Sequence, residues 1–205
     1  MIEVRTMKLS GLRDREEYLS REAGSLRREK ASRFIREDDR LRCLAVGYMM
    51  RRCLPGYSEA LLCTGKAGKP FLRDGVPFSI SHGGNYIVLA WCAGAEGIGV
   101  DAEPIREMEY YQAILPYSMT AKERDAVGGD AGTAVRIWTR KESLYKCVGE
   151  GVSDFRELPE VLEDRVLFSG RLCRLKSWEE EDHAFSVALH GSEESMDLMI
   201  QPVAL

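Results

Sequence analysis

The stretch FSISHGGNYIVLAWCAGAEGIGVDAEP, residues 78–104, carries the clearest signal for the fold. It contains three runs of apolar, β-branched or aromatic residues that are bounded by glycines. Such runs predict strands, here over Phe78–Ser81, Tyr86–Cys92 and Ile98–Glu103. We expect these strands to be neighbours.

Helical patterns lie on both sides of this stretch. Before it, apolar residues recur at helical spacing from Asp38 onward until Pro55 and Gly56 end the helix. After it, Thr120 and Glu123 have the form of a capping box, and a longer helix is predicted over 133–148 with Gly149 as its stop.

The remaining C-terminal sequence predicts strands over 165–176, 184–189 and 197–203. Helix followed by strands therefore occurs twice, which predicts an α+β protein built as a pseudo-dimer of two similar halves, residues 1–104 and 105–205. The two halves show no sequence identity to each other.

Composition bounds the class of protein. With 205 residues and 44% hydrophobic side chains, the chain can bury one substantial core or two small ones. Its net charge of −4 argues against a general nucleic-acid binder. No apolar run approaches the length of a membrane span, and the first residues have no apolar signal core, so we expect a cytoplasmic protein without a membrane partner. The six cysteines form no Cys-x-x-Cys pair and are interpreted as buried thiols.

Positive charge is concentrated between Arg27 and Arg52. Nine basic residues against four acidic ones leave this segment a local charge of +5. The segment could meet an anionic ligand, or it could be a solvated helix face with Arg/Glu pairs at helical spacing.

Two acids end the third predicted strand. Side chains alternate along a strand, so Asp101 and Glu103 point to one face with Cα atoms about 6.6 Å apart, and Ala102 points to the other. Their repulsion is tolerable on a wet face, as at an exposed strand end, or with a cation between them.

A third acid lies on the long predicted helix. Trp138, Glu142 and Lys146 share one face of that helix, and the tryptophan indicates that this face is packed. Glu142 and Lys146 could also be an ordinary surface ion pair. Three carboxylates without a histidine or cysteine cluster suit Mg²⁺, which commonly also binds substrate phosphate.

Small and polar residues near the strands suit a phosphate. Lys69 lies in a constrained turn, and Ser81 and His82 precede Gly83-Gly84, where the backbone can approach an anion closely. The two glycines are equally compatible with a simple hairpin turn.

Taken together, these segments resemble the 4′-phosphopantetheinyl transferase superfamily, in particular the single-chain kind that activates surfactin synthetase and related enzymes. The resemblance is carried by the following stretches: GKPFL (68–72), FSISHGG (78–84), GIGVDAEPI (97–105), WTRKESLYKCVGEG (138–151) and the basic segment EKASRFIREDDRLRCLAVGYMMR (29–51).

The resemblance implies a fold and a set of roles. The active site would lie in the cleft between the two halves. Asp101, Glu103 and Glu142 resemble the magnesium ligands, and Lys146 resembles the lysine beside the reacting phosphate. Contacts to coenzyme A would come from five further positions: Ser81 and His82 at the phosphates, Lys69 in the nucleotide pocket, and Lys30 with Arg33 at the 3′-phosphate. Cys43 stands near a position where relatives can carry a hydroxyl residue, which puts one such contact in doubt.

The implied reaction moves phosphopantetheine from coenzyme A to a serine of an apo acyl or peptidyl carrier protein, with adenosine 3′,5′-bisphosphate as the leaving product. Glu142, Lys146 and His82 would be the catalytic residues of an enzyme that works as a monomer. Two alternatives stay open: a metal-dependent phosphohydrolase and a non-catalytic coenzyme A-binding protein.

Overall fold

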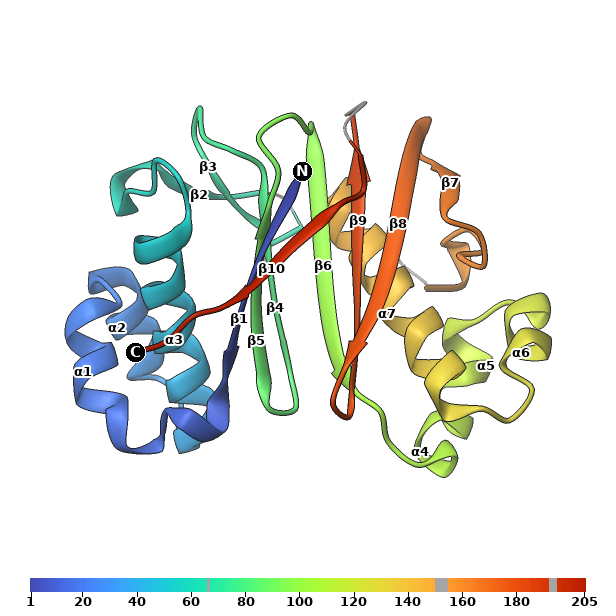
Figure 1. The fold of residues 1–205 in the computed structure, drawn as a ribbon, viewed down its shortest axis with the longest axis horizontal. Coiled ribbons are helices and arrows are strands. Elements are labelled where there is room, and N and C mark those ends of the chain that lie inside the picture. The colour runs from blue at the N-terminus through green and yellow to red at the C-terminus, as the bar shows by residue number, and fades with distance from the viewer. Residues whose placement is uncertain (66, 150–154, 192–194) are drawn as a thin grey trace.

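The computed structural model describes residues 1–65, 67–149, 155–191 and 195–205 and has a mixed α+β architecture (Figure 1). Its strands form two four-stranded sheets and one small hairpin. The first sheet has the order β10 (Leu198–Pro202), β1 (Ile2–Lys8), β5 (Tyr86–Trp91), β4 (Phe78–Gly83). The second has the order β6 (Gly97–Pro104), β9 (His183–His190), β8 (Arg171–Glu180), β7 (Arg165–Phe168). The hairpin pairs β2 (Leu62–Thr64) with β3 (Pro70–Leu72).

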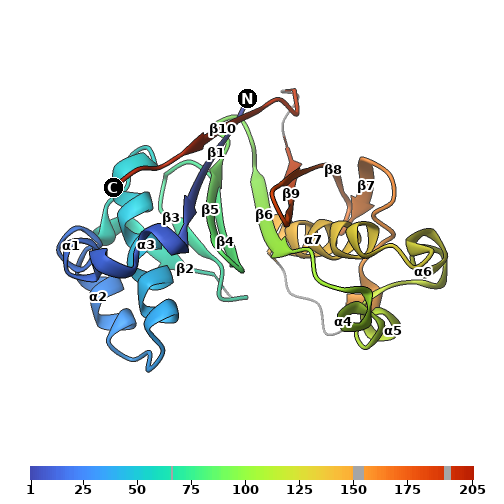
Figure 2. The same ribbon diagram turned by 60° about the horizontal axis from the view of Figure 1, so that its bottom comes forward.

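Helices cover the outer faces of the two large sheets. Three lie beside the first sheet: α1 (Glu16–Glu22), α2 (Ser25–Ala31) and α3 (Glu37–Cys53). Four lie beside the second: α4 (Met108–Gln112), α5 (Leu115–Ser118), α6 (Ala121–Val127) and α7 (Ala131–Val148). Figure 2 shows α3 and α7 on opposite sides of the strands. The layers therefore run helix, sheet, sheet, helix.

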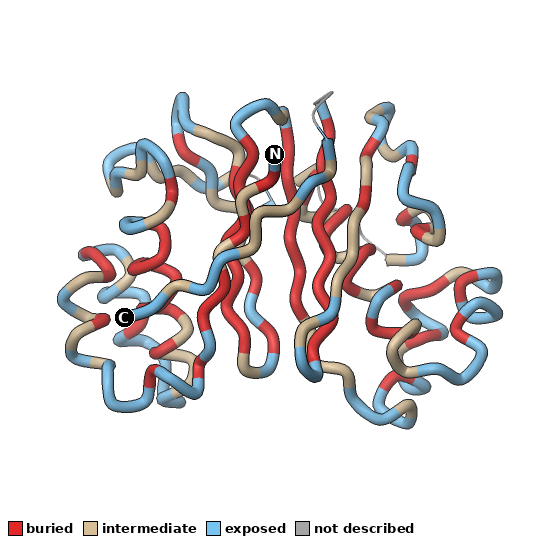
Figure 3. The backbone as a smooth tube through the Cα atoms, in the orientation of Figure 1, coloured by how far each residue is buried: buried red, intermediate tan, exposed pale blue. Residues whose placement is uncertain are grey.

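Three hydrophobic clusters hold these layers together. One joins α3 to the first sheet through residues such as Leu44, Met49 and Leu89, and a second joins α7 to the second sheet. The third lies between the sheets, where Val88 of β5 and Val100 of β6 belong to the same cluster. The central strands are accordingly buried along most of their length (Figure 3).

Local signals explain where the helices begin and end. Thr120 and Glu123 form the predicted capping box at the start of α6, which confirms that prediction. The α7 helix is capped at its start by Asp130 and ends at Gly149, whose φ of +69° is readily adopted only by glycine. The α3 helix has three acids in its first turn and two arginines in its last, a distribution that complements the helix dipole.

The α+β class and the three strands within 78–104 are confirmed. These strands were expected to be neighbours, but they do not all pair with one another. β4 and β5 pair with each other, whereas β6 pairs with β9, across a long stretch of chain. The predicted strand over 165–176 is a hairpin, because Ser169 and Gly170 both adopt positive φ and turn the chain between β7 and β8.

Several elements were not predicted from sequence, namely β1, α1, α2 and the small hairpin. The C-terminal strand β10 runs parallel to β1, so the end of the chain returns to the sheet that holds its beginning. The pseudo-symmetry of the two halves and their boundary at residue 104 stay predictions. None of the described helices has the length and apolar character that crossing a membrane would need.

Candidate functional site

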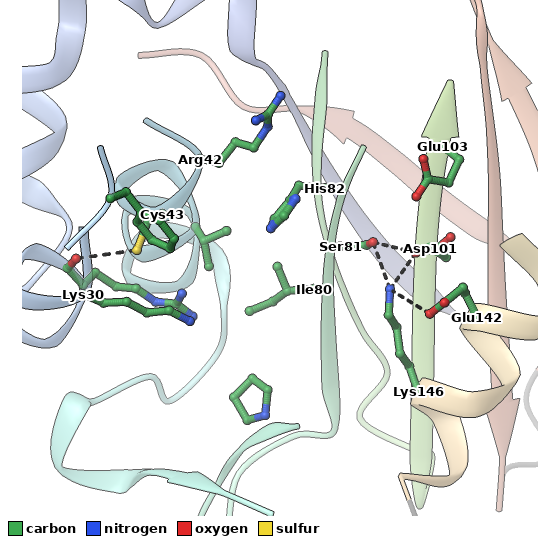
Figure 4. Close-up of a pocket in the computed structure, with 14 residues that line it drawn as sticks. Lys30, Arg42, Cys43, Ile80, Ser81, His82, Asp101, Glu103, Glu142 and Lys146 are labelled. Carbon is green, nitrogen blue, oxygen red and sulfur yellow. Dashed lines mark hydrogen bonds and ion pairs between the residues drawn. The ribbon is translucent and has the colours of Figure 1, made fainter. Parts of the chain in front are cut away.

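A cavity of about 410 Å³ lies where β4, β6, α3 and α7 approach one another (Figure 4). Its lining is divided by charge. One wall carries Asp101, Glu103, Glu142 and Lys146, and the opposite wall carries Lys30 and Arg42, with Ser81 and His82 from β4 between them. Arg27 of α2 also lines the cavity. Segments far apart in sequence therefore form a single site.

The acidic wall is built by packing α7 directly on β6. Both Asp101 and Glu103 line the cavity, while Ala102 is buried in the core between the sheets, so the predicted alternation is confirmed. A side chain at Gly99 would collide with the carbonyl oxygen of Ser143. This close approach lets the turn of α7 that carries Glu142 lie against the end of β6.

Lys146 lies at the centre of the acidic wall. Its Nζ is 2.6 Å from Asp101 Oδ1, 3.8 Å from Glu142 Oε2 and 3.0 Å from Ser81 Oγ. The Ser81 hydroxyl in turn donates to Asp101 Oδ1 at 2.7 Å. The Lys146 side chain keeps 26% of its exposure, whereas that of Asp101 keeps 3%. Lys146 thus extends from α7 into the cavity and pairs there with a carboxylate that is almost fully buried (Figure 4).

The carboxylates of this wall carry more negative charge than their surroundings readily accommodate. Burial, and then the neighbouring Asp101, raise the pKa of Glu103 to about 7. Burial also raises the pKa of Glu142, although the ammonium of Lys146 opposes this effect. The Oδ2 atom of Asp101 is buried and has no hydrogen-bond partner within the part of the chain that the structure describes.

This arrangement bears on the predicted cation site. Among the described residues, no group of three or more His, Cys, Asp or Glu side chains is drawn together as metal ligands. The positive charge between Asp101 and Glu142 is the Lys146 ammonium. The donor set nevertheless fits a hard cation, since three carboxylates face one cavity and an oxygen of the most buried one lacks a partner.

The basic wall comes from α2 and α3. Lys30 lines the cavity as predicted, together with Arg27 and Arg42. Burial and the nearby guanidinium of Arg42 lower the pKa of His82, which favours a neutral imidazole at this place. The wall therefore offers three cations and a histidine to an anion.

Two predicted contacts lie elsewhere. Arg33 is exposed after the end of α2 and pairs with Glu29, so it does not line the cavity. The Nζ of Lys69 donates to the carbonyl oxygen of Ile98 at 2.7 Å, and its side chain lines a neighbouring cavity. Burial lowers the pKa of Lys69. Both proposed roles stay predictions, as do the roles of the other site residues.

Arg27, Phe34 and Arg42 also line the cavity and were not predicted individually, although both arginines belong to the basic segment between Arg27 and Arg52. Helical spacing could have predicted Arg27 as a site residue, because Arg27 and Lys30 are three residues apart on α2 and so share a face. Helical spacing could not place Arg42 at the cavity, because its guanidinium is oriented by the distant Gly84 carbonyl oxygen as well as by Asp39 on the same helix.

Comparison with known proteins shows similarity to one family. Residues 97–191, which include β6, α7 and β9, match the 4′-phosphopantetheinyl transferase superfamily. The last two residues of the motif 138–151 lie outside the described residues.

Two relatives are similar to the chain at low identity. It is 28% identical over 140 residues to 4′-phosphopantetheinyl transferase Sfp of Bacillus subtilis, and the aligned region covers 62% of this chain and 60% of that protein. It is 25% identical over 163 residues to 4′-phosphopantetheinyl transferase gsp of Aneurinibacillus migulanus, which covers 74% of this chain and 68% of that protein. The chain thus spans about three fifths of the length of the Bacillus subtilis relative. The matched region supplies the acidic wall of the cavity, so the part of the chain that builds this wall is similar to the 4′-phosphopantetheinyl transferase superfamily.

Proposed function

We propose that the protein transfers the 4′-phosphopantetheine group of coenzyme A to a serine of an apo acyl or peptidyl carrier protein and releases adenosine 3′,5′-bisphosphate. The observation that carries this proposal is one cavity with two opposed walls. Three carboxylates and Lys146 form one wall, and three basic side chains form the other. A diphosphate with a further 3′-phosphate would meet complementary charge there.

The basic wall would bind and orient coenzyme A. Arg27, Lys30 and Arg42 would pair with its phosphates, because guanidinium and ammonium groups form strong charge-assisted hydrogen bonds with phosphate oxygens. His82 lies beside them and, with its lowered pKa, would donate a hydrogen bond as a neutral imidazole. Lys69 and Arg33 would contribute only if their side chains move, since neither lines this cavity here.

Asp101, Glu103 and Glu142 would hold Mg²⁺. The unpartnered Oδ2 of Asp101 and the raised pKa of Glu103 both indicate carboxylates that a cation would stabilise. When bound, Mg²⁺ would neutralise negative charge on the diphosphate as its bond breaks. Lys146, which lies between Asp101 and Glu142 on the same wall, would face the phosphates of the substrate.

The carrier serine would be the nucleophile. Its oxygen would form a bond to the β-phosphorus of coenzyme A while the bond to the leaving adenosine 3′,5′-bisphosphate breaks. Glu142 would accept the serine proton, a role that suits a carboxylate whose pKa is raised by burial. The Lys146 ammonium would stabilise charge on the phosphoryl oxygens.

We also propose that the enzyme acts in the cytoplasm as a monomer, with coenzyme A and the carrier protein as its partners. The net charge of −4 supports the absence of a nucleic-acid partner. A membrane partner is likewise not part of the proposal.

The test is to incubate the protein with coenzyme A, Mg²⁺ and a panel of apo carrier proteins and to measure intact masses. The proposal expects at least one carrier to gain one phosphopantetheine group, and expects no gain when its acceptor serine is replaced by alanine. Release of phosphate or nucleotide without any carrier would favour a phosphohydrolase instead. Binding of coenzyme A with no turnover on any carrier would favour a non-catalytic binding protein.

A further inference from the structure

His183 lies outside the cavity, at the start of β9, and both of its ring nitrogens are engaged. Its Nδ1 is 2.8 Å from Asp182 Oδ1, and its Nε2 is 3.2 Å from the backbone nitrogen of Asn85. A backbone N–H can only donate, so Nε2 must be the acceptor and the ring proton must lie on Nδ1. Asp182 therefore fixes the tautomer that Asn85 requires.

The imidazole packs directly against the turn between β4 and β5. Gly84 has a φ of +50°, and a Cβ at this position would collide with His183 Nε2. The Tyr86 ring packs on the edge of the imidazole, with ring centroids 4.8 Å apart. The side chain of His183 is 3% exposed, so the turn at Gly84 and Asn85 is held by a well-packed group from the other sheet.

The same turn contacts the basic wall of the cavity. Arg42 Nη2 donates to the carbonyl oxygen of Gly84 at 3.0 Å, and Arg42 Nη1 lies 3.1 Å from Asp39 Oδ1. Two acceptors therefore orient this guanidinium. One of them, the Gly84 carbonyl, belongs to the peptide unit whose N–H is bonded to His183.

We propose that His183 is a positioning residue for coenzyme A binding. It holds the peptide between Gly84 and Asn85, and this peptide orients the Arg42 guanidinium at the cavity. His183 itself touches no ligand. The inference rests on the proposed function, because it takes the anion at Arg42 to be a phosphate of coenzyme A.

Two amide substitutions separate the hydrogen bond from the packing. In His183→Gln the amide oxygen can reach the place of Nε2 and accept from Asn85, whereas in His183→Asn the shorter side chain cannot. We expect His183→Asn to raise the Kd for coenzyme A about fivefold to tenfold, since it loosens one charge-assisted phosphate contact. His183→Gln should stay within about twofold of the wild type. The kcat at saturating coenzyme A should be unchanged in both variants.

Arg42→Met supplies the test of the pathway. If His183 acts through Arg42, then adding His183→Asn to Arg42→Met should weaken binding no further. Lys8→Met is the matched control, because Lys8 pairs with Glu181 in the same turn between β8 and β9 but does not contact Arg42. Its Kd for coenzyme A should equal that of the wild type.

Asp182→Ala provides an independent test of the same role if His183→Asn does not fold. Asp182 is 76% exposed, so Asp182→Ala should fold, and it frees the ring to adopt the wrong tautomer. We expect a rise of about twofold to threefold in the Kd for coenzyme A.

Three results would overturn the inference: an unchanged Kd in His183→Asn and Asp182→Ala, equal weakening by the asparagine and glutamine variants, or a full additional loss in the Arg42→Met background. If the wild-type protein itself fails to bind coenzyme A, the proposed function fails and the inference falls with it. Wild-type binding with unaffected variants removes the role of His183 alone.

Discussion

Replacing Lys141 by methionine should strongly destabilise the fold. Lys141 precedes Glu142 on α7, and its Nζ is 3.0 Å from Glu123 Oε2 on α6, with both side chains 0% exposed. The Glu123 carboxylate also accepts hydrogen bonds from the backbone nitrogens of Thr120 and Val161, at 2.9 and 3.0 Å. Without Lys141, a buried carboxylate would keep these two donors and lose its paired cation.

The size of the effect follows from that local geometry. Removing one partner of a buried ion pair typically costs about 3–5 kcal/mol. The two remaining N–H donors stabilise the carboxylate, so we expect the lower end, about 3 kcal/mol. In a chain of this length, that loss corresponds to a fall in Tm of about 6–12 °C.

Urea denaturation followed by circular dichroism measures this loss directly. Lys122→Met is the matched control, because Lys122 is 71% exposed and pairs with Glu160 at 2.8 Å, and an ion pair this exposed to solvent contributes little to stability. Combining Lys141→Met with Glu123→Gln should recover only part of the stability: no buried charge remains, but the glutamine NH2 group cannot accept one of the two backbone hydrogen bonds that the carboxylate accepts. A Lys141→Met protein as stable as the Lys122→Met control would refute this reasoning.

Three further predictions concern the cavity. Glu142→Gln should lower transfer to a carrier protein by at least about a hundredfold in a steady-state assay, with an unchanged circular dichroism spectrum; turnover like that of the wild type would exclude Glu142 as the base. Lys30→Ala should raise the KM for coenzyme A about tenfold with a smaller effect on kcat, and an unchanged KM would place Lys30 outside the binding site. The pKa of Glu103 is raised from 4.5 to about 7 in the fold, so as pH rises its carboxyl group ionises first in the unfolded chain. The fold therefore loses stability as pH rises from about 4.5 to about 7, and the loss is complete above pH 7. In EDTA, Glu103→Gln should therefore raise Tm relative to the wild type at about pH 8, and the difference should disappear near pH 4; an equal difference at both values would contradict this sign.

Local sequence patterns predicted the acidic wall well. Asp101 and Glu103 share a face because strands alternate, and Glu142 and Lys146 share a face because they are one helical turn apart. The capping box marked the start of α6 and Gly149 marked the end of α7, because each of these signals lies within a few residues of the feature it determines. The start of α7 at Ala131, after the Asp130 cap, lies two residues before the predicted start.

Local patterns could not predict the pairing of distant strands or the positions of two basic side chains. The pairing of β6 with β9, and of β1 with β10, joins strands that are far apart in the chain. Arg33 was expected at the cavity, but α2 ends at Ala31, so Arg33 no longer follows the helical face of Lys30. Lys69 was expected there too, yet its ammonium is drawn to the Ile98 carbonyl oxygen on β6.

The structure of the protein crystallised with coenzyme A and Mg²⁺ would test the central claim most directly. We predict a cation about 2.1 Å from carboxylate oxygens of Asp101, Glu103 and Glu142 and from the diphosphate, with Lys146 turned from Asp101 toward the phosphoryl oxygens. Coenzyme A bound away from this cavity, or a diphosphate held here with the three carboxylates contacting neither it nor a cation, would contradict the account.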